Sequence, residues 1–471
     1  MASSNNDGPI EPEAEPWRIT QNDHLEQDLL EEDAESQERV DIPVDDVEKA
    51  FSFKKLWAFT GPGFLMSIAY LDPGNIESDL QSGAQAAYKL LWVLLSAHII
   101  GMLLQRMSAR LGVVSGKHMA EVAYQFYPRL PRIILWLMIE IAIVCSDMQE
   151  VIGTAIAIFL LSKGFVPLYV GVFITILDTF TFLLIDRYGI RKLELIFGFL
   201  ILTMTVSFGY EFVVVKPPIG EVISGMVVPW CAGCGKGEFM QAISVVGAVI
   251  MPHNLYLHSA LVKPTNISHL SRQLLFSSAS SSTMTGTYTG QFVMEGFVKI
   301  EWPKWKRVLI TRAIAITPTL VLTFYSQGVQ NLTGMNDFLN CVQMIQLPFA
   351  LIPIITFTSS RKIMHDFRSS KVFQIFALIT SALILSINVY FISDYVFSRL
   401  GSEWYIIMVL APITFAYVLF VLYLALYCLV SCEIIPDTVS IRGFSFNKSY
   451  ENDAPWLAVD SSAVHDNAGY Q

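Results

Sequence analysis

Long apolar stretches alternate with short polar or charged segments between residues 56 and 430. Each stretch is near or above the roughly 20 residues that a helix needs to cross the hydrocarbon core of a bilayer. The pattern therefore predicts an all-α polytopic membrane domain over residues 51–430 with about ten spans. These are expected at 56–88, 89–112, 133–161, 165–185, 193–212, 239–262, 307–325, 335–358, 372–396 and 404–430.

Two of these spans are interrupted, the first at Asp72-Pro73-Gly74-Asn75 and the sixth at Met251-Pro252-His253-Asn254. Proline removes a backbone donor and clashes with the preceding turn, so the helix breaks there. At membrane depth, non-helical backbone survives only where it lines a cavity or is buried in protein. Two interrupted spans at corresponding places in two halves of a chain indicate the substrate site of an inverted-repeat transporter.

Residues 264–300 do not fit this pattern, because they are rich in serine and threonine and too polar for a complete lipid-facing span. We predict an irregular junction there. If the two halves repeat, the second half lacks two helices, and the spans at 372–396 and 404–430 lie outside the repeat. The loss of an even number of helices leaves the orientation of every downstream span unchanged.

The composition agrees with a membrane protein, with 53% hydrophobic and 15% charged residues and a mean hydropathy of +0.49. The net charge of -10 arises in the first 50 residues, which hold 16 of the 41 acidic residues. A segment this acidic buries too little apolar surface to fold, so residues 1–50 are predicted to be a disordered tail. Residues 431–471 are predicted to form a C-terminal tail, and nothing in the chain indicates nucleic-acid binding.

Lysine and arginine predict the orientation of the spans, because they are enriched in cytosolic loops. If the N-terminus is cytosolic, the inward segments hold four clusters of basic residues, whereas the outward loops hold only Lys89, Lys163, Lys216, Lys236 and Arg399. Both termini are therefore predicted to be cytosolic. The first 50 residues contain no apolar region of a cleavable signal peptide, so the first span is expected to serve as the signal.

The two breaks carry a mixed set of metal ligands. Asp72 supplies a carboxylate at membrane depth, where an unpaired charge is costly, so it needs a partner. Asn75 adds an amide oxygen, Met251 a thioether sulfur, and Ala248 a carbonyl freed by the proline of the break. A thioether suits first-row transition metals and is poor for Ca²⁺ or Mg²⁺, so the breaks predict a site for Mn²⁺, Fe²⁺ or similar ions. Gln346 is expected to add an amide oxygen when the site closes. The structural alternatives are a core methionine and a helix-capping aspartate.

Ionisable residues near the breaks predict a path for protons. His253 and His258 lie just after the second break, and histidine titrates between pH 5 and 8. Asp147 and Glu150 are three residues apart in the third span and share a helix face. Arg312 stands inside the span at 307–325 and could neutralise them. Packing histidines and a purely structural ion pair are the alternatives.

The six cysteines are too few and too scattered for a disulfide framework. Cys231 and Cys234 form a Cys-x-x-Cys pair in one loop, without the second ligand pair that a structural zinc site needs. We therefore expect free thiols or a local disulfide there rather than a metal site.

Three segments carry a resemblance to a known family: Asp72-Pro73-Gly74-Asn75, Ala248 to Asn254, and Ser146 to Glu150. They resemble the natural resistance-associated macrophage protein family of proton-coupled divalent metal transporters, over about residues 51–430. The resemblance implies a leucine-transporter-like fold with inverted repeats, in which helices 1 and 6 are broken. It also implies that Asp72, Asn75, Ala248 and Met251 bind the metal, and that Asp147, Glu150, Arg312 and His253 carry or tune the proton.

The chain departs from the family in one region. Animal members have helix 7, a glycosylated outer loop and helix 8 between the equivalents of Lys263 and Ser280, where this chain has about sixteen residues. Residues 281–286 resemble the surviving end of helix 8. The departure resembles an in-frame deletion, and it puts in question alternating access by rocking of the two repeats.

These observations predict a proton-coupled transporter of Fe²⁺, Mn²⁺ and similar ions towards the cytosol, in the plasma membrane, an endosomal-lysosomal membrane, or both. The partners are the metal ions, protons and the lipid bilayer; no cofactor is expected, and no oligomeric state is predicted. The alternative is a transport-defective family member that interferes with complete chains. A symporter of organic solutes is disfavoured by Met251, and an enzyme by the lack of a nucleophile and base pair.

Overall fold

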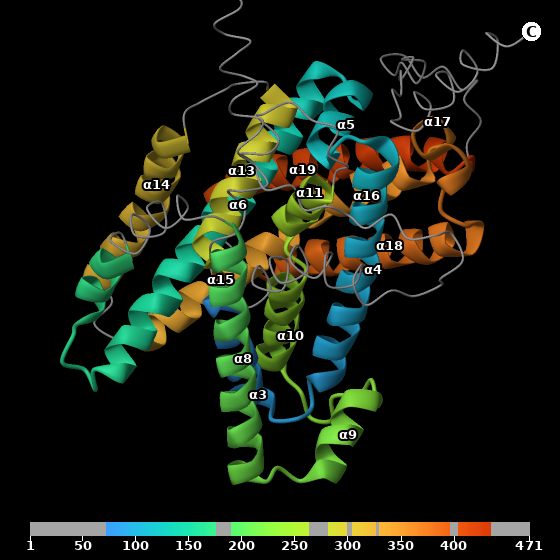
Figure 1. The fold of residues 1–471 in the computed structure, drawn as a ribbon. Coiled ribbons are helices and arrows are strands. Elements are labelled where there is room, and N and C mark those ends of the chain that lie inside the picture. Colours follow the sequence, from blue (N-terminus) through green and yellow to red (C-terminus); the bar gives the residue numbers. More distant parts are fainter. Residues whose placement is uncertain are drawn as a thin grey trace, which may run out of the picture. The chain divides into compact units, whose positions relative to one another are not determined.

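The computed structural model describes residues 72–175, 190–262, 281–298, 304–325, 329–395 and 404–434. This part of the chain is helical, and no strand occurs in it (Figure 1). The longer helices are α3 (Pro73–Ala86), α4 (Leu91–Ser115), α6 (Arg129–Leu161), α8 (Ile190–Val215), α10 (Lys236–Val249), α11 (Pro252–Leu261), α13 (Ser281–Val298), α14 (Lys304–Tyr325), α15 (Val329–Gln346), α16 (Pro348–Ser359), α18 (Lys371–Tyr395) and α19 (Trp404–Ser431). Short helices are α5 (Met119–Phe126), α9 (Ile219–Val227) and α17 (Arg361–Met364), with a 3₁₀ turn at His365–Phe367.

The predicted spans correspond to these helices wherever the chain is described. The spans at 89–112, 133–161 and 307–325 are α4, α6 and α14, and those at 372–396 and 404–430 are α18 and α19. Six helical segments in the described part are long and apolar enough to cross a membrane: Leu91–Ser115, Gly198–Val215, Lys236–Leu261, Leu332–Ser359, Lys371–Ser393 and Ala411–Ser431.

Three local features differ from the expectation. An irregular junction was predicted over 264–300. This prediction is wrong for its second part, because residues 281–298 form the 18-residue helix α13. Buried packing partners override the polar composition there, since Val293 and Phe297 join the main hydrophobic core. The loop expected between the fifth and sixth spans contains α9, and the span at 335–358 is divided into α15 and α16.

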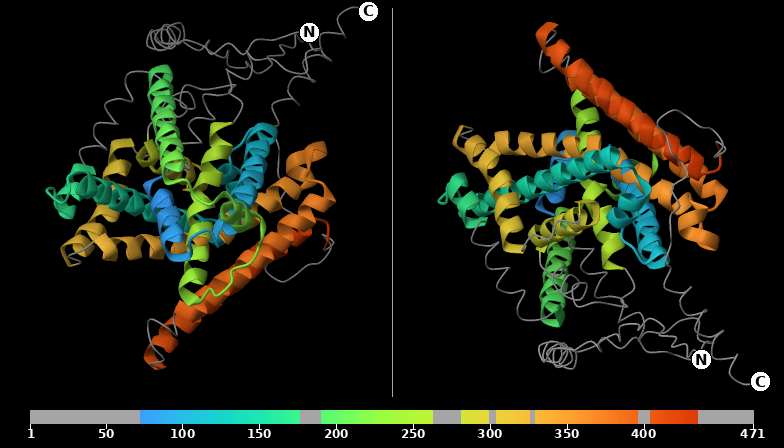
Figure 2. Two further views of the ribbon diagram at one scale, coloured as in Figure 1. Left: turned by 90° about the horizontal axis from the view of Figure 1, so that it is seen from below. Right: turned by 90° about the horizontal axis from the view of Figure 1, so that it is seen from above.

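Two of the spanning segments form the interior of the described helices. Lys236–Leu261, which is α10 and α11, and Leu332–Ser359, which contains α15 and α16, are each 83% buried, against 39% or less for the other candidate spans. α10 packs against both α3 and α15, and α15 packs against α6. Figure 2 shows α19, in red, lying outside this centre, where it packs on α16. The broken helices are therefore enclosed by the others.

Glycine allows two of the central contacts. A Cβ atom on Gly247 of α10 would overlap the carbonyl oxygen of Asn340 on α15. A Cβ atom on Gly153 of α6 would meet Pro73 at the start of α3. Because any side chain at these positions would separate the helices, the absence of one fixes how closely α3, α6, α10 and α15 approach.

Several predictions fall on residues outside the described part of the chain. These are the acidic tail at 1–50, the first half of the first span, most of the span at 165–185, residues 263–280 of the junction, and the C-terminal tail beyond residue 434.

Candidate functional site

The first break is a capped helix start. Asp72 has an extended backbone (φ -75°, ψ 139°) and stands directly before α3, with Pro73 as the first helical residue. Its carbonyl accepts hydrogen bonds from the amides of Asn75 at 3.0 Å and Ile76 at 3.2 Å. The carboxylate therefore lies at the positive end of the helix dipole, although Asp72 is only 2% exposed.

The second break repeats this arrangement in the middle of the sixth span. α10 ends at Val249, Met251 is extended (φ -74°, ψ 123°), and Pro252 begins α11. Since Pro252 has no amide hydrogen, it cannot bond the Ala248 carbonyl as a continuous helix would. Met251 is 1% exposed, and its sulfur accepts a hydrogen bond from Asn254 Nδ2 at 3.4 Å. The predicted interruption of the sixth span is therefore confirmed, and α3 begins at the first predicted break; each break has a buried side chain.

Polar contacts hold the helices that follow and precede the two breaks together. The hydroxyls of Ser78 on α3 and Ser244 on α10 are 3.4 Å apart. Gln241 Nε2 donates to the Ser78 carbonyl at 3.2 Å. The helix that leaves the first break thus runs beside the helix that enters the second, which places the predicted ligands of both breaks in one region of the interior.

Asp72 lacks a side-chain partner. In the described part of the chain, no side chain donates a hydrogen bond to either of its carboxylate oxygens, and no lysine or arginine pairs with it. Asp147 and Glu150 of α6 lie close enough to repel it electrostatically. A buried carboxylate needs a compensating cation or a proton. This arrangement is therefore suited to binding cations.

The other ionisable candidates lie on α6, α11 and α14. Asp147 and Glu150 are both buried on α6, and His253 is buried on the first turn of α11. His253 Nδ1 has no hydrogen-bond partner in the described chain. His258 instead faces α4, where its Nδ1 contacts the side-chain oxygen of Gln105. The backbone of Arg312 lies on α14, which packs on α6, but its side chain is outside the described part.

Gln346 lies at a third break. It is the last residue of α15, it is 3% exposed, and no described group donates to its side-chain oxygen. Pro348 removes the amide that would bond the Met344 carbonyl. That carbonyl accepts from Asn388 Nδ2 at 2.9 Å, and the Ile345 carbonyl accepts from the Tyr417 hydroxyl at 2.9 Å. Side chains of α18 and α19 thus stabilise this break.

The sequence analysis missed a buried polar stripe on α15. Asn336, Asn340 and Gln343 are all at most 1% exposed, at helical spacing on one face. Asn340 Nδ2 donates to Ser244 at 3.2 Å, and Gln343 Nε2 donates to Gln149 Oε1 at 2.6 Å. Amides at i, i+4 and i+7 within an otherwise apolar span were the signal that could have revealed it. The stripe bridges α6 and α10 beside the two breaks.

Two further carboxylates lie along the same helices, away from the breaks. Glu77 of α3 accepts a hydrogen bond from Asn336. Asp337 of α15 accepts from Ser244 at 3.0 Å and from Gln241 at 3.4 Å. Both acids are hydrogen-bonded to side chains of the neighbouring helices.

Cys231 and Cys234 form a disulfide in the turn before α10, which confirms the expected local bridge among the alternatives. Lys89 Nζ donates to the carbonyl of Ala232 between them at 3.0 Å. The turn is thereby held against the connection between α3 and α4.

Comparisons with known proteins agree on one family. The sequence model described as "Natural resistance-associated macrophage protein-like" matches residues 63–274 and 273–394. The NRAMP-like transporter smf-1 of Caenorhabditis elegans is 81% identical, covering 100% of both chains. Natural resistance-associated macrophage protein 2 of Homo sapiens is 47% identical and covers 84% of each chain. The Eremococcus coleocola manganese transporter, in complex with an aromatic bis-isothiourea substituted compound, has a TM-score of 0.70 at 26% identity, covering 84% of this chain and 99% of that one.

Proposed function

The chain belongs to the natural resistance-associated macrophage protein family, whose members are metal-ion transporters and not enzymes, and we propose that it moves Fe²⁺, Mn²⁺ and similar ions towards the cytosol together with protons. The likeness to the manganese transporter confirms the expected all-α, multi-pass fold with interrupted helices.

The observation that carries the proposal is the buried Asp72 carboxylate: in the described part of the chain no side chain pairs with it, and two further carboxylates lie near it. Asn75 and Met251 flank the same region from the two breaks, and Ala248 offers its carbonyl. In this site Asp72 provides the charge, the oxygens provide hard ligands, and the thioether favours transition metals over Ca²⁺ and Mg²⁺. We expect the side-chain oxygen of Gln346 to complete the ligand shell.

Proton coupling follows from the same electrostatics. A divalent cation at Asp72 attracts the carboxylates of Asp147 and Glu150 and favours their ionised forms, so metal binding promotes release of a proton from these acids. Metal binding and proton binding at these acids are therefore linked. His253 adjoins the second break and is in position to exchange a proton there. His258, bound to Gln105, lies one helical turn further along α11.

The direction of transport rests on the distribution of basic residues and on the membrane potential. The Lys/Arg asymmetry places both termini in the cytosol. An inward-negative potential then drives a cation towards the cytosol. The plasma membrane and the endosomal-lysosomal membranes are the two locations that this orientation fits.

The shortened connection between α11 and α13 supports a second candidate, a transport-defective chain that interferes with complete ones. The two family-model matches meet at residues 273–274, inside that connection. The alignment with smf-1 runs over 562 positions, although this chain has 471 residues. The relative therefore has residues that this chain lacks. All of the proposed metal ligands remain.

The test is uptake of radioactive Mn²⁺ at neutral and acid pH in cells that express this exact chain, with surface labelling to confirm delivery. Asp72→Asn is expected to abolish uptake. Asp79→Asn is the matched control, because it removes the same charge from an exposed position on the same helix. Delivery without uptake would refute transport by this chain and favour the interfering variant, which is then tested by expressing it together with a complete relative.

A further inference from the structure

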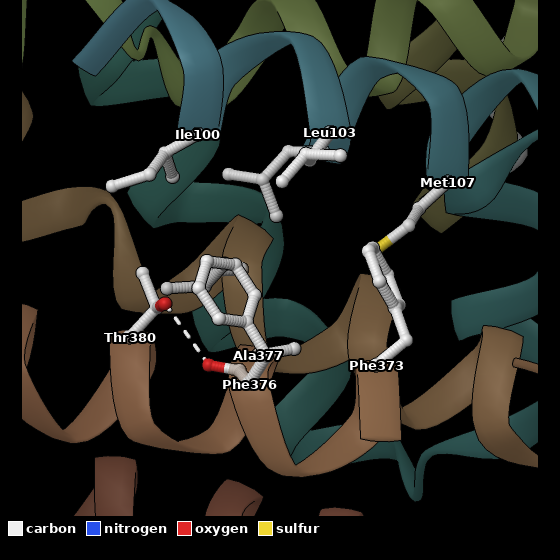
Figure 3. A pocket seen from close by; sticks show the side chains of 9 residues that line it. Ile100, Leu103, Met107, Phe373, Phe376, Ala377 and Thr380 are labelled. Atoms are coloured by element: carbon white, nitrogen blue, oxygen red, sulfur yellow. Dashed lines mark hydrogen bonds between the residues drawn. The ribbon is translucent and has the colours of Figure 1, made fainter. Parts of the chain in front are cut away.

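A shallow groove, open on one side, lies between α4 and α18. Its walls are Leu103 and Met107 of α4 and Phe373 and Ala377 of α18, and Leu351 of α16 also lines it (Figure 3). The lining is apolar: the one hydroxyl in it, that of Thr380, donates to the Phe376 carbonyl at 3.0 Å. The groove therefore offers no polar ligand of its own.

α16 keeps the groove open. It packs against both α4 and α18, and so it separates these two helices. Phe376 of α18 is 46% exposed at the rim, whereas Leu351 is 1% exposed. From Ile100 to Met107, the groove follows α4 for about 10 Å, given a rise of 1.5 Å per residue. The groove is apolar and open on one side, which suits the side of an acyl chain.

Two arginines stand at one end of the groove. Arg106 follows Leu103 by three residues and Arg110 follows Met107 by three, so helical periodicity puts Arg110 next to the groove face of α4 and Arg106 on its flank, one turn earlier. The guanidinium of Arg110 contacts the carbonyl of Phe367, in the 3₁₀ turn just before α18. This contact fixes the arginine at the end of the groove where α18 begins.

The charge of this arginine pair is uncompensated. Among the described residues, no carboxylate lies within ion-pair distance of Arg106 or Arg110. The neighbouring cations Arg368 and Lys371 share one carboxylate, that of Glu433, at 2.7 Å and 3.2 Å. Like charges one helical turn apart destabilise a helix, so an anion bound between the two arginines relieves a repulsion.

We propose that the groove between α4 and α18 binds an acyl chain of an anionic phospholipid, whose phosphate is held by Arg106 and Arg110. The apolar groove would contact the acyl chain of the phospholipid, and the adjoining arginines would contact its phosphate. Guanidinium groups bind phosphate oxygens in paired, charge-assisted hydrogen bonds. A lipid with net negative charge is favoured over phosphatidylcholine, whose choline brings a further positive charge to the arginines. The site selects one lipid class, beyond the general solvation that a bilayer provides.

The test is native mass spectrometry of the full chain in detergent, with phosphatidylserine and phosphatidylcholine of identical acyl chains. We expect phosphatidylserine to be retained preferentially. Arg106→Gln with Arg110→Gln should lower this preference roughly tenfold or more, at about 1 kcal/mol for each basic residue near a lipid surface. Replacing both arginines by lysine should preserve most of it. Ala377→Phe, which fills the groove and leaves the arginines in place, should reduce retention of the lipid.

The matched control is Lys117→Gln with Arg129→Gln, which removes two charges near the ends of α4 and α6 but away from the groove. It should leave the lipid preference unchanged. Equal retention of the two lipids by the natural chain would overturn the proposal. The proposal would also fail if inorganic phosphate displaced the lipid and Ala377→Phe did not change lipid retention. That result would mean that the arginines bind a simple anion. Loss of a dimer rather than of a lipid in Ala377→Phe would assign the groove to a second copy of the chain.

Discussion

Gly153 of α6 lies against Pro73, the first residue of α3, so closely that a Cβ atom at position 153 would overlap the proline ring. This contact joins the helix that carries Asp147 and Glu150 to the break that carries Asp72. The glycine at position 153 therefore allows α6, with the proposed proton-binding acids, to approach the proposed metal ligand Asp72.

Gly153→Val should displace the first break without changing any ligand. We expect overpacking to destabilise the protein by about 1–3 kcal/mol and to reduce Mn²⁺ uptake more than surface delivery. Thermal unfolding in detergent and uptake per delivered molecule measure the two effects. Gly198→Ala on α8 is the control, since nothing lies within 4 Å of a Cβ there. Unchanged uptake in Gly153→Val would show that the contact does not position Asp72.

Met251→Ala should alter ion selectivity more than it alters folding. Removing the thioether weakens binding of Mn²⁺ and Fe²⁺, whereas the remaining oxygen ligands accept Ca²⁺ more readily. Competition of Ca²⁺ against radioactive Mn²⁺ measures this change. Met240→Ala, which removes a thioether from the same helix before the break, should leave the competition as it is. If Ca²⁺ competed equally well against Mn²⁺ in both variants, Met251 would be a packing residue of the core and not a metal ligand.

Glu150→Gln should uncouple uptake from pH. If the acids of α6 bind the transported proton, removing one should flatten the rise in Mn²⁺ uptake between neutral and acid pH while Asp72 still binds the metal. Glu140→Gln on the same helix is a control, because Glu140 accepts from Trp136 at 3.1 Å and lies two turns or more from the break. A pH profile that survives Glu150→Gln would exclude this carboxylate as the coupling group.

Asn388→Ala and Tyr417→Phe should each remove a side-chain donor from a carbonyl at the third break; the Met344 carbonyl then keeps only the Leu347 amide, at 3.2 Å. An unsatisfied buried acceptor costs about 1–3 kcal/mol, so both variants should unfold at lower temperature. Ser386→Ala provides the comparison, because that hydroxyl is exposed and bonds only within its own helix. A melting temperature in Asn388→Ala equal to that of the comparison would mean that another donor replaces the amide.

The ion pairs of Glu433 predict a pH dependence at the end of α19. Hydrogen bonds from Arg368 and then Lys371 hold the pKa of this exposed carboxylate below its usual range. Because the pKa is lower in the folded chain, the stabilisation is complete above the unfolded-state pKa and is lost as the pH falls through the folded-state pKa. Glu433→Gln should therefore lower the melting temperature slightly at neutral pH and not at strongly acid pH. High salt should shrink the difference, and a difference that persists at acid pH would argue against the ion pairs.

Sequence patterns predicted the spans and the two breaks, because apolar length and proline act locally along the chain. The metal-binding chemistry of Met251 and Asp72 follows from their residue types and can be predicted without knowing the fold. The stripe of Asn336, Asn340 and Gln343 was not recognised, since its meaning depends on which helices face α15. α13 was missed for a related reason: its threonines look solvent-exposed in sequence, yet Thr289 is fully buried. Tertiary partners decided both cases.

The support that α18 and α19 give to the third break has a consequence for shortened versions of this chain. Every proposed metal ligand precedes residue 347, so a transcript that stopped before residue 372 would still encode the complete ligand set. It would nevertheless lack the amide of Asn388 and the hydroxyl of Tyr417, which satisfy the carbonyls next to Gln346. A premature stop there should therefore yield a product recognised by quality control and degraded, although no residue that touches the ion is lost.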